Sequence, residues 1–409
     1  MKIAILGPLD LEFMGGGETN SMMIGNMLSD LGHDVTYFGT GCPLENIPVE
    51  KIYKKIRFKY VPSAFSRDPM AHPLIVKATS LLSLGIVGAM DFSRIKSMAM
   101  EFDAVYFSIP NLLARRLTPI LTKNGKRVIL ANHGTFFEYF GNSRNPFFKL
   151  FQKIGEQVLI KPLSGYLGKL LVHTQTSFQT SVYKHLGFDQ EGILEIPQNN
   201  VDFSQYITKR NSGPFTVVFL GRMVKSKGVE LLSEIIKLNP HIRFKVIGNG
   251  PLLRTFMAST KNSNAEVFGY VSDREKREIL GNSDLMVVPS QFDSLSISAI
   301  EGLASGLPIV ASDCASGPKY ILGLHEGLGT LVPRNTEAFS NCINQYWKRS
   351  ISNPDMAYKQ KLERRSVARS VFDVTKLENA LRSDFSYFLS NGVSAIFKEM
   401  EPASEEIPT

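Results

Sequence analysis

Two acidic residues, Asp293 and Glu301, lie eight positions apart in a segment predicted to form a short loop followed by a helix. A loop that enters a helix presents free backbone N–H groups and the positive end of the helix dipole. Such a place suits a diphosphate group, and carboxylates beside it can accept hydrogen bonds from hydroxyl groups. The segment is therefore chemically suited to a molecule that carries both phosphates and hydroxyls.

Two cations, Arg222 and Lys227, flank a loop that directly follows a predicted buried strand. A departing diphosphate needs charge compensation, which proteins supply with a metal ion or with fixed cations. The sequence contains no Asp-x-Asp triplet, a common metal-holding feature. An Arg and a Lys at this spacing usually mark a solvated loop. Together with the Asp293–Glu301 segment, however, they predict fixed cations for phosphates.

The elements that must position these residues alternate between short apolar strands and helices. The first half is expected to form a strand at 2–7, a loop at Gly15-Gly16-Gly17, a helix at 18–31 and a strand at 35–38. The second half is expected to form strands at 215–220, 243–247, 267–271 and 285–288, with helices at 229–238 and 274–280. Such alternation predicts parallel sheets covered on both faces.

The same architecture occurs twice, so we predict an α/β protein with two Rossmann-like domains. A chain of 409 residues is also too long for one compact domain. We expect an N-terminal domain at 1–200, a C-terminal domain at 201–371, terminal helices at 372–390 that pack back on the N-terminal domain, and a tail at 391–409. Residues 211–214 are the expected hinge. Ligands of doubly wound sheets bind at the carboxyl ends of strands, so the parallel sheets should face each other across an interdomain cleft.

Residues 288–313 resemble the nucleotide-sugar signature of glycosyltransferase family 4, in the glycogen-synthase-like clan with the GT-B fold. The resemblance rests on the two acidic residues around a short loop, the following helix, and Gly306-x-Pro308 before the next strand. It implies retaining, metal-independent transfer of a hexose from a nucleoside-diphosphate sugar to a hydroxyl acceptor. It also implies catalytic roles for His133, Arg222, Lys227 and Asp293. The implied donor-binding residues are Gly16, Gly17, Arg222, Lys227, Tyr270, Val271, Asp293, Ser294, Leu295, Ser296, Ile297 and Glu301.

The resemblance also implies a separate role for each of these residues. Asp293 would hold the donor sugar and Glu301 the ribose, while the two cations hold the leaving diphosphate. His133 would lie near the anomeric carbon. The departing diphosphate would help to deprotonate the incoming hydroxyl, so that no protein nucleophile and no cofactor is needed.

This chain departs from the family pattern at three positions. The family usually has Glu where Asp293 stands, and commonly Gly where Ser296 and Asn200 stand. Asn tolerates left-handed backbone angles, so the turn around Asn200 is expected to keep its shape. The changes at 293 and 296 leave open a second interpretation, a catalytically silent GT-B subunit that binds sugars or scaffolds a complex.

The charges are unevenly distributed along the chain. Residues 51–184 carry 20 Lys and Arg against 6 Asp and Glu, although the net charge of the whole chain is only +8. No recognisable nucleic-acid module accompanies this excess, so we expect no nucleic-acid partner. The expected partners are a nucleotide-sugar donor and a glycan or lipid-linked acceptor. The aromatic and basic segment 136–161 has two interpretations, peripheral contact with an anionic membrane or a buried helix with basic edges.

Three widely spaced cysteines, Cys42, Cys314 and Cys342, fit neither a disulfide framework nor a zinc site. The sequence offers no secretory signal and no apolar run long enough to span a bilayer. We therefore expect a cytoplasmic protein, with attachment to the inner face of the membrane left open.

Overall fold

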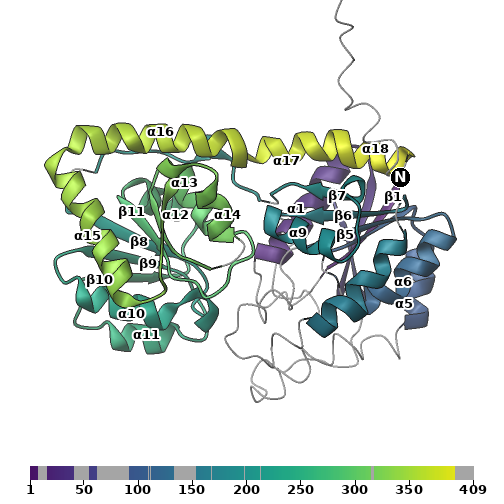
Figure 1. Cartoon of the computed structure of the whole chain (residues 1–409), viewed down its shortest axis with the longest axis horizontal. Coiled ribbons are helices and arrows are strands. Elements are labelled where there is room, and N and C mark those ends of the chain that lie inside the picture. The colour runs from purple at the N-terminus through teal and green to yellow at the C-terminus, as the bar shows by residue number, and fades with distance from the viewer. Residues whose placement is uncertain are drawn as a thin grey trace, which may run out of the picture. The chain divides into compact units, whose positions relative to one another are not determined.

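The computed structural model describes residues 1–7, 16–40, 55–61, 92–108, 110, 112–132, 153–166, 168–197, 199–211, 213–314 and 317–391. The chain divides into two compact units, which Figure 1 shows with their elements labelled. Unit 1 comprises Met1–Gln198 and Leu377–Thr409, and unit 2 comprises Asn199–Lys376. Each unit contains one sheet whose paired strands are all parallel. The predicted α/β class with two Rossmann-like domains is confirmed.

Unit 1 has the strand order β3-β2-β1-β4-β5-β6-β7. The strands are β1 Lys2–Leu6, β2 Asp34–Thr40, β3 Arg57–Val61, β4 Ala104–Phe107, β5 Arg127–Ala131, β6 Leu170–Thr174 and β7 Ile193–Glu195. The helices are α1 Gly16–Asp30, α5 Phe92–Met100, α6 Leu112–Lys123, η3 Glu156–Ile160, η4 Lys161–Tyr166, α9 Ser177–His185 and η5 Gln190–Gly192. The central strands are mainly apolar because helices cover both faces of a parallel sheet. All four residues of β4 are buried, for example.

The C-terminal helical segment completes unit 1. It consists of α17 Val374–Ala380, which begins in unit 2, followed by η9 Leu381–Phe385 and α18 Ser386–Asn391. Phe385 lies edge-on against the ring of His173 in β6, with ring centroids 5.1 Å apart. His173 is fully buried, and burial lowers the pKa of its imidazole to about 3. The imidazole is therefore neutral at physiological pH and serves as part of the core.

Unit 2 has the strand order β10-β9-β8-β11-β12-β13. The strands are β8 Thr216–Leu220, β9 Arg243–Ile247, β10 Ala265–Gly269, β11 Leu285–Val288, β12 Ile309–Ser312 and β13 Gly329–Val332. The helices are η6 Phe203–Gln205, η7 Lys225–Lys227, α10 Val229–Leu238, α11 Leu253–Ser259, α12 Asp273–Gly281, α13 Ile297–Ala304, α14 Gly317–Gly323, η8 Glu326–Leu328, α15 Thr336–Ser352 and α16 Pro354–Phe372.

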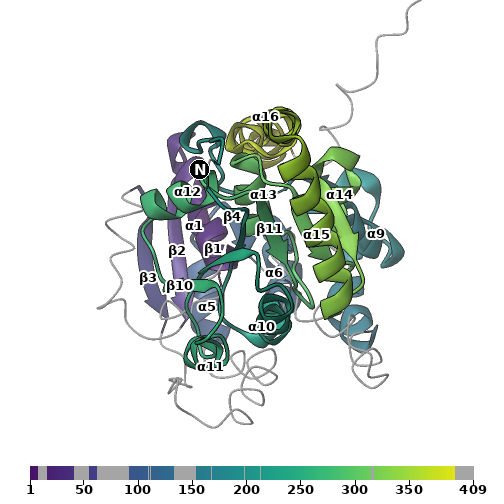
Figure 2. The same cartoon turned by 90° about the vertical axis from the view of Figure 1, so that its left-hand side faces the viewer.

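Side chains of β11 alternate between the two cores of unit 2, as the period of two in a strand requires. Leu285 and Val287 pack with residues of α10, α11 and α15. Met286 and Val288 pack with residues of α12, α13, α14 and α16. Figure 2 looks at this unit and shows α16 beside α13, the helix that carries Glu301. Helices thus cover both faces of the sheet, so a ligand can reach the sheet only at the ends of its strands.

Three details differ from the sequence-based expectations. Helix α1 begins at Gly16, so Gly16 and Gly17 open the helix instead of lying in a loop. Glycine costs a helix most in its interior, so two glycines are tolerated in the first turn. Strand β10 ends at Gly269, whose φ of +67° leaves the extended region, so Tyr270 and Val271 follow the strand.

The third difference concerns two turns near the start of unit 2, one at 211–214 and one at Asn200. The expected hinge at 211–214 lies inside unit 2, where Asn211 Nδ2 donates to Asp284 Oδ2 at 2.6 Å. Asn200 does not adopt a positive φ. Its turn is held instead by Asn199, whose side-chain oxygen accepts from Val201 N at 3.0 Å. Polar side chains thus fix both turns without the backbone freedom that the sequence suggested.

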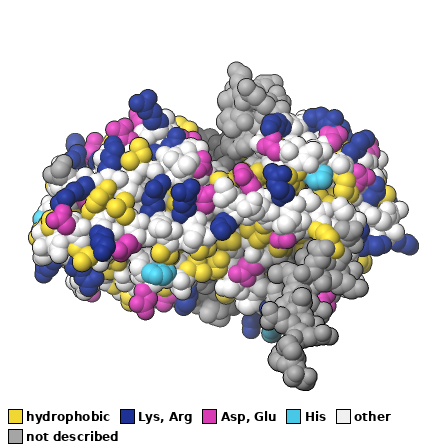
Figure 3. All heavy atoms as spheres, turned by 90° about the horizontal axis from the view of Figure 1, so that it is seen from above, with side chains coloured by type: hydrophobic (Ala, Val, Ile, Leu, Met, Phe, Trp, Pro, Cys, Tyr) yellow, Lys and Arg dark blue, Asp and Glu magenta, His cyan; other side chains and the backbone are white. Residues whose placement is uncertain are grey.

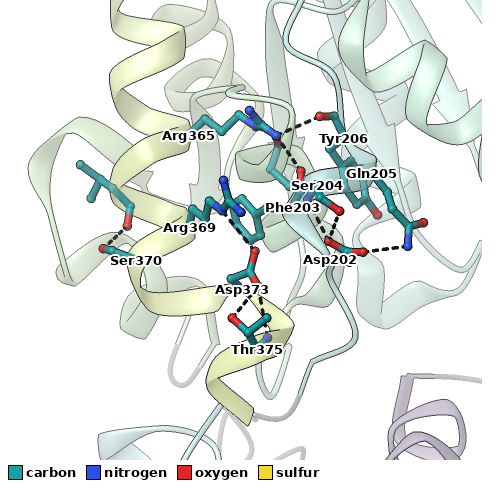
Figure 4. Close-up of polar contacts among 12 residues, drawn as sticks. Asp202, Phe203, Ser204, Gln205, Tyr206, Arg365, Arg369, Ser370, Asp373 and Thr375 are labelled. Atoms are coloured by element: carbon teal, nitrogen blue, oxygen red, sulfur yellow. Dashed lines mark hydrogen bonds and ion pairs between the residues drawn. The ribbon is translucent and has the colours of Figure 1, made fainter. Parts of the chain in front are cut away.

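The chain enters and leaves unit 2 through a shared polar cluster, shown in Figure 4. Arg365 of α16 donates from Nη2 to the carbonyl oxygens of Phe203 at 2.6 Å and Tyr206 at 3.0 Å. Asp202 caps η6 through Ser204 N at 2.9 Å. Where the chain leaves, Val374 N donates to Val201 O at 3.1 Å. The incoming and outgoing segments are therefore joined directly.

Candidate active site

The residues predicted to bind phosphates and hydroxyls gather at the point where the strand order of unit 2 reverses. Strand β8 lies there between β9 and β11, and ligands of open α/β sheets bind in the crevice at such a switch point. The loop after β8 and the loop after β11 are joined because Gln291 N donates to Ser226 O at 2.8 Å. Gly228 approaches Pro289 so closely that a Cβ atom would lie 2.0 Å from the Pro289 carbonyl oxygen.

The structure brings two of the predicted residues into direct contact. Lys227 Nζ lies 2.6 Å from Asp293 Oδ2, with 26% of the lysine side chain and 10% of the aspartate side chain exposed. The backbone of Asp293 is also fixed, because its carbonyl oxygen accepts from Gly317 N at 2.9 Å. A largely dehydrated carboxylate and a cation therefore meet at the carboxyl end of the sheet, where a charged ligand can compete for either of them.

The other cation and the predicted base-covering residues lie on neighbouring strand ends. Arg222 follows β8 and is exposed. Tyr270 follows β10 and has 85% of its surface exposed, whereas Val271 is half-buried against the core. An exposed aromatic ring at a strand end can stack on a flat ligand. These positions extend the site along the edge of the sheet.

The loop before α13 contains a strained residue. Ser296 has φ 64° and ψ 65°, and it is the one non-glycine residue with a positive φ in the part of the chain that the structure describes. Ser296 is buried, and its hydroxyl oxygen has no hydrogen-bond partner among the described residues. The left-handed backbone explains why a glycine suits this position. Leu295 is buried and Ser294 and Ile297 are half-buried, so the loop is packed rather than extended into solvent.

A Ser296→Gly variant is expected to raise the free energy of unfolding by about 1 kcal/mol. It relieves a left-handed conformation that costs about 1–2 kcal/mol and removes an unpaired buried hydroxyl, against the greater entropy of glycine in the unfolded chain. Urea unfolding measures the change. Ser298→Gly, in the first turn of α13, is the matched control and should lower stability by about 0.5 kcal/mol. A loss of stability in Ser296→Gly would contradict the strain.

Glu301 is held by two residues that the sequence did not indicate. Tyr206 donates from its hydroxyl to Glu301 Oε1 at 2.9 Å, and Lys276 Nζ lies 2.6 Å from the same oxygen. Burial, followed by the charge of Glu301, raises the pKa of Tyr206, so its hydroxyl remains a donor. Burial alone would lower the pKa of Lys276, but the carboxylates of Glu301 and Asp273 outweigh it and raise that pKa. The lysine therefore stays charged at neutral pH.

Tyr206 and Lys276 could not be found from spacing. They lie 95 and 25 positions before Glu301 in the sequence. Tyr206 belongs to the segment through which the chain enters unit 2. Lys276 lies on α12, directly after the Ser272–Glu275 capping box, so its sequence context indicates only the start of a helix. Only the packing of α12 and the crossing segment against α13 brings the three side chains together.

The predicted residues of unit 1 are only partly described. Gly16 and Gly17 are the first residues of α1, and residues 8–15 before them lie outside the described residues. His133 lies outside the described residues, as does most of segment 136–161. Asn132, its neighbour, is buried at the end of β5, where its carbonyl oxygen accepts from Gln175 Nε2 at 2.9 Å.

Among the described residues, no three His, Cys, Asp or Glu side chains gather as a metal site would require. None of the described helices is long and apolar enough to cross a membrane. Figure 3 shows one face of the molecule, on which the Lys and Arg side chains of the described residues are interspersed with Asp and Glu.

Comparison with known proteins agrees with the site. Residues 200–363 match the family described as glycosyl transferases group 1. Solved structures share the whole architecture: HepE of Anabaena in complex with UDP and glucose aligns over 94% of this chain and 99% of its own, with a TM-score of 0.68 and 15% identity. The fold is the GT-B fold of glycosyltransferases. The switch-point site of unit 2 lies within the matched region of this GT-B chain.

Two curated relatives are also glycosyltransferases by name. TuaC of Bacillus subtilis, assigned to teichuronic acid biosynthesis, is 28% identical over 239 residues, which cover 56% of this chain and 57% of TuaC. The D-rhamnosyltransferase WbpZ of Pseudomonas aeruginosa is 24% identical over 63% of this chain and 67% of its own length. The match to TuaC thus spans little more than half of that protein. Together the comparisons show the GT-B fold, and the relatives that share sequence with this chain are glycosyltransferases by name.

Proposed function

We propose that this GT-B chain is a retaining, metal-independent hexosyltransferase of family 4. It moves a hexose from a nucleoside-diphosphate sugar to a hydroxyl of a glycan, lipid-linked or small-molecule acceptor. The observation that carries the proposal is the contact between Lys227 and Asp293 at the switch point of unit 2. A fixed cation suits the donor diphosphate, and a fixed carboxylate suits the sugar hydroxyls.

Donor binding would rearrange this pair. A diphosphate carries more negative charge than one carboxylate, so it competes for Lys227 and Arg222 and leaves Asp293 to accept from the sugar. The N–H groups at the start of α13 add partial positive charge beside the phosphates. As the bond from the anomeric carbon to the diphosphate breaks, charge grows on the leaving oxygen, where the two cations stabilise it. The acceptor oxygen then bonds to the anomeric carbon from the same face of the sugar, and its proton passes to the leaving diphosphate oxygen.

Thermal unfolding with UDP, GDP, ADP and their sugars tests donor binding. A ligand at one hundred times its Kd adds about 2.7 kcal/mol, which corresponds to a rise of roughly 5–10 °C in Tm for a domain of this size. We expect one base to give this shift, with EDTA leaving it unchanged and Glu301→Ala removing it. Glu363→Ala, on the surface of α16, is the control. The anomeric configuration of the product, followed by NMR, tests retention.

A catalytically silent GT-B subunit is the second candidate, favoured by the strained Ser296 and by the short side chain of Asp293. It predicts that no nucleotide at millimolar concentration shifts the Tm, or that a bound donor sugar is never hydrolysed or transferred. Slow hydrolysis of a bound donor by the purified protein would contradict it. An EDTA-sensitive shift would instead contradict metal independence alone.

A further inference from the structure

The carboxylate of Glu301 is occupied on one side only by the contacts described above. Both the Tyr206 hydroxyl and the Lys276 ammonium group contact Oε1, at 2.9 Å and 2.6 Å. A carboxylate oxygen has about two acceptor sites, so these two donors fill Oε1. A ligand hydroxyl that approaches Glu301 must therefore be met by Oε2. The glutamate side chain is 12% exposed, so part of it is open to solvent.

Tyr206 is itself held in the same frame as Glu301. Arg365 donates from Nη2 to Tyr206 O at 3.0 Å and from Nε to Ala304 O at 2.8 Å. Ala304 is the last residue of α13, the helix that carries Glu301. One guanidinium group thus ties the Tyr206 segment to α13, as the contacts of Arg365 in Figure 4 show on the Tyr206 side. Arg365 therefore holds the segments that carry the donor and the acceptor of the Tyr206–Glu301 hydrogen bond in a fixed relation.

Lys276 fixes the carboxylate from a different helix. It lies on α12 and bridges Asp273 Oδ1 at 2.8 Å and Glu301 Oε1 at 2.6 Å. The lysine side chain is 20% exposed, so most of its length is packed. Two donors from two elements, meeting on one oxygen, restrict rotation of the Glu301 carboxyl group more than either does alone.

We propose that Tyr206 and Lys276 are positioning residues that direct Glu301 Oε2 toward the ribose hydroxyls of a nucleoside diphosphate. The inference rests on the proposed function, in which Glu301 contacts the ribose. Its consequence is specificity. A carboxylate that is oriented in advance binds a ribose more tightly than a 2′-deoxyribose, because the deoxy sugar leaves a charged acceptor unpaired. A freely rotating carboxylate would turn to water and lose most of that discrimination.

Calorimetric titration with UDP, GDP and ADP and with their 2′-deoxy forms tests the proposal. For the base that binds, the wild-type chain should prefer the ribose form about tenfold, the effect of one hydrogen bond to a charged group. Tyr206→Phe and Lys276→Met should each reduce that preference to about threefold or less. The preference is a ratio of two Kd values on one protein, so a general loss of stability does not change it.

Matched controls are available in unit 2. Tyr346→Phe removes a hydroxyl that contacts Thr330 Oγ1 at 3.1 Å, and Lys359→Met removes an exposed lysine of α16. Both should keep the tenfold preference. If one variant fails to fold, the other still decides, since both act on Oε1. Circular dichroism and the emission of the single tryptophan, Trp347, report folding.

The outcomes separate this inference from the proposed function. If the wild-type chain binds none of the three diphosphates, the proposed function fails and the inference fails with it. If the wild-type chain binds one of them without preferring ribose, or if both variants keep the tenfold preference, the positioning role is overturned while donor binding stands. A reduced preference in both variants, with the controls unchanged, supports the role.

Discussion

Lys227→Met is expected to lower kcat of sugar transfer about 10²–10³-fold, the usual effect of removing one group that stabilises developing charge. In the structure Lys227 Nζ lies 2.6 Å from Asp293, at the carboxyl end of β11 and beside the loop that would hold the diphosphate. Loss of the cation raises the barrier because the leaving diphosphate then gains its charge without compensation. Initial rates at saturating donor measure the effect. Lys225→Met, exposed in the same loop, is the control and should stay within about threefold.

A double variant separates catalysis from folding. Lys227→Met leaves the largely buried Asp293 carboxylate without its partner, which should also cost about 2 kcal/mol of stability. Adding Asp293→Asn removes the unpaired charge, so the double variant should regain most of that stability. It should not regain kcat, since neither substitution restores a cation. Recovery of activity together with stability would mean that Lys227 acts only through the fold.

The two sheets, and the placement of Lys227 and Asp293 at strand ends of unit 2, were predictable from local sequence. Short apolar runs followed by glycine-containing loops predict parallel strands, and the residues that follow two adjacent strands must lie at one edge of the sheet. The resemblance of residues 288–313 to the family signature also predicted the loop and helix that the structure has at this place. Site residues that directly follow a strand can therefore be predicted from their order in the sequence.

Contacts between elements far apart in sequence were not predictable. Tyr206 and Lys276 reach Glu301 because α12 and the crossing segment pack on the same face as α13, and no spacing encodes that choice. The two positions where glycine is replaced also behaved differently. Ser296 adopts the left-handed backbone, while Asn200 avoids it because the Asn199 side chain closes the turn. The sequence indicated where backbone freedom matters but not which neighbour would replace it.

Gly228→Ala is expected to lower the free energy of unfolding of unit 2 by about 3 kcal/mol or more. Gly228 has φ +74°, which costs an alanine about 1–2 kcal/mol, and overpacking adds about 1–3 kcal/mol. The added Cβ would lie 2.0 Å from the backbone oxygen of Pro289, so one of the two loops must move. Urea unfolding followed by the emission of Trp347, in α15 of unit 2, measures the loss.

The same substitution should lower activity below the unfolding transition, because Gly228 directly follows Lys227. A loop displaced from Pro289 also weakens the hydrogen bond from Gln291 N to Ser226 O, which joins the two halves of the site. Gly323→Ala is the control, since a Cβ there meets no atom within 4 Å, and it should leave stability unchanged or slightly raised. A Gly228→Ala variant that unfolds like the wild type would show that the loop can leave Pro289 at little cost. Close packing at Pro289 would then not be what places Lys227 beside Asp293.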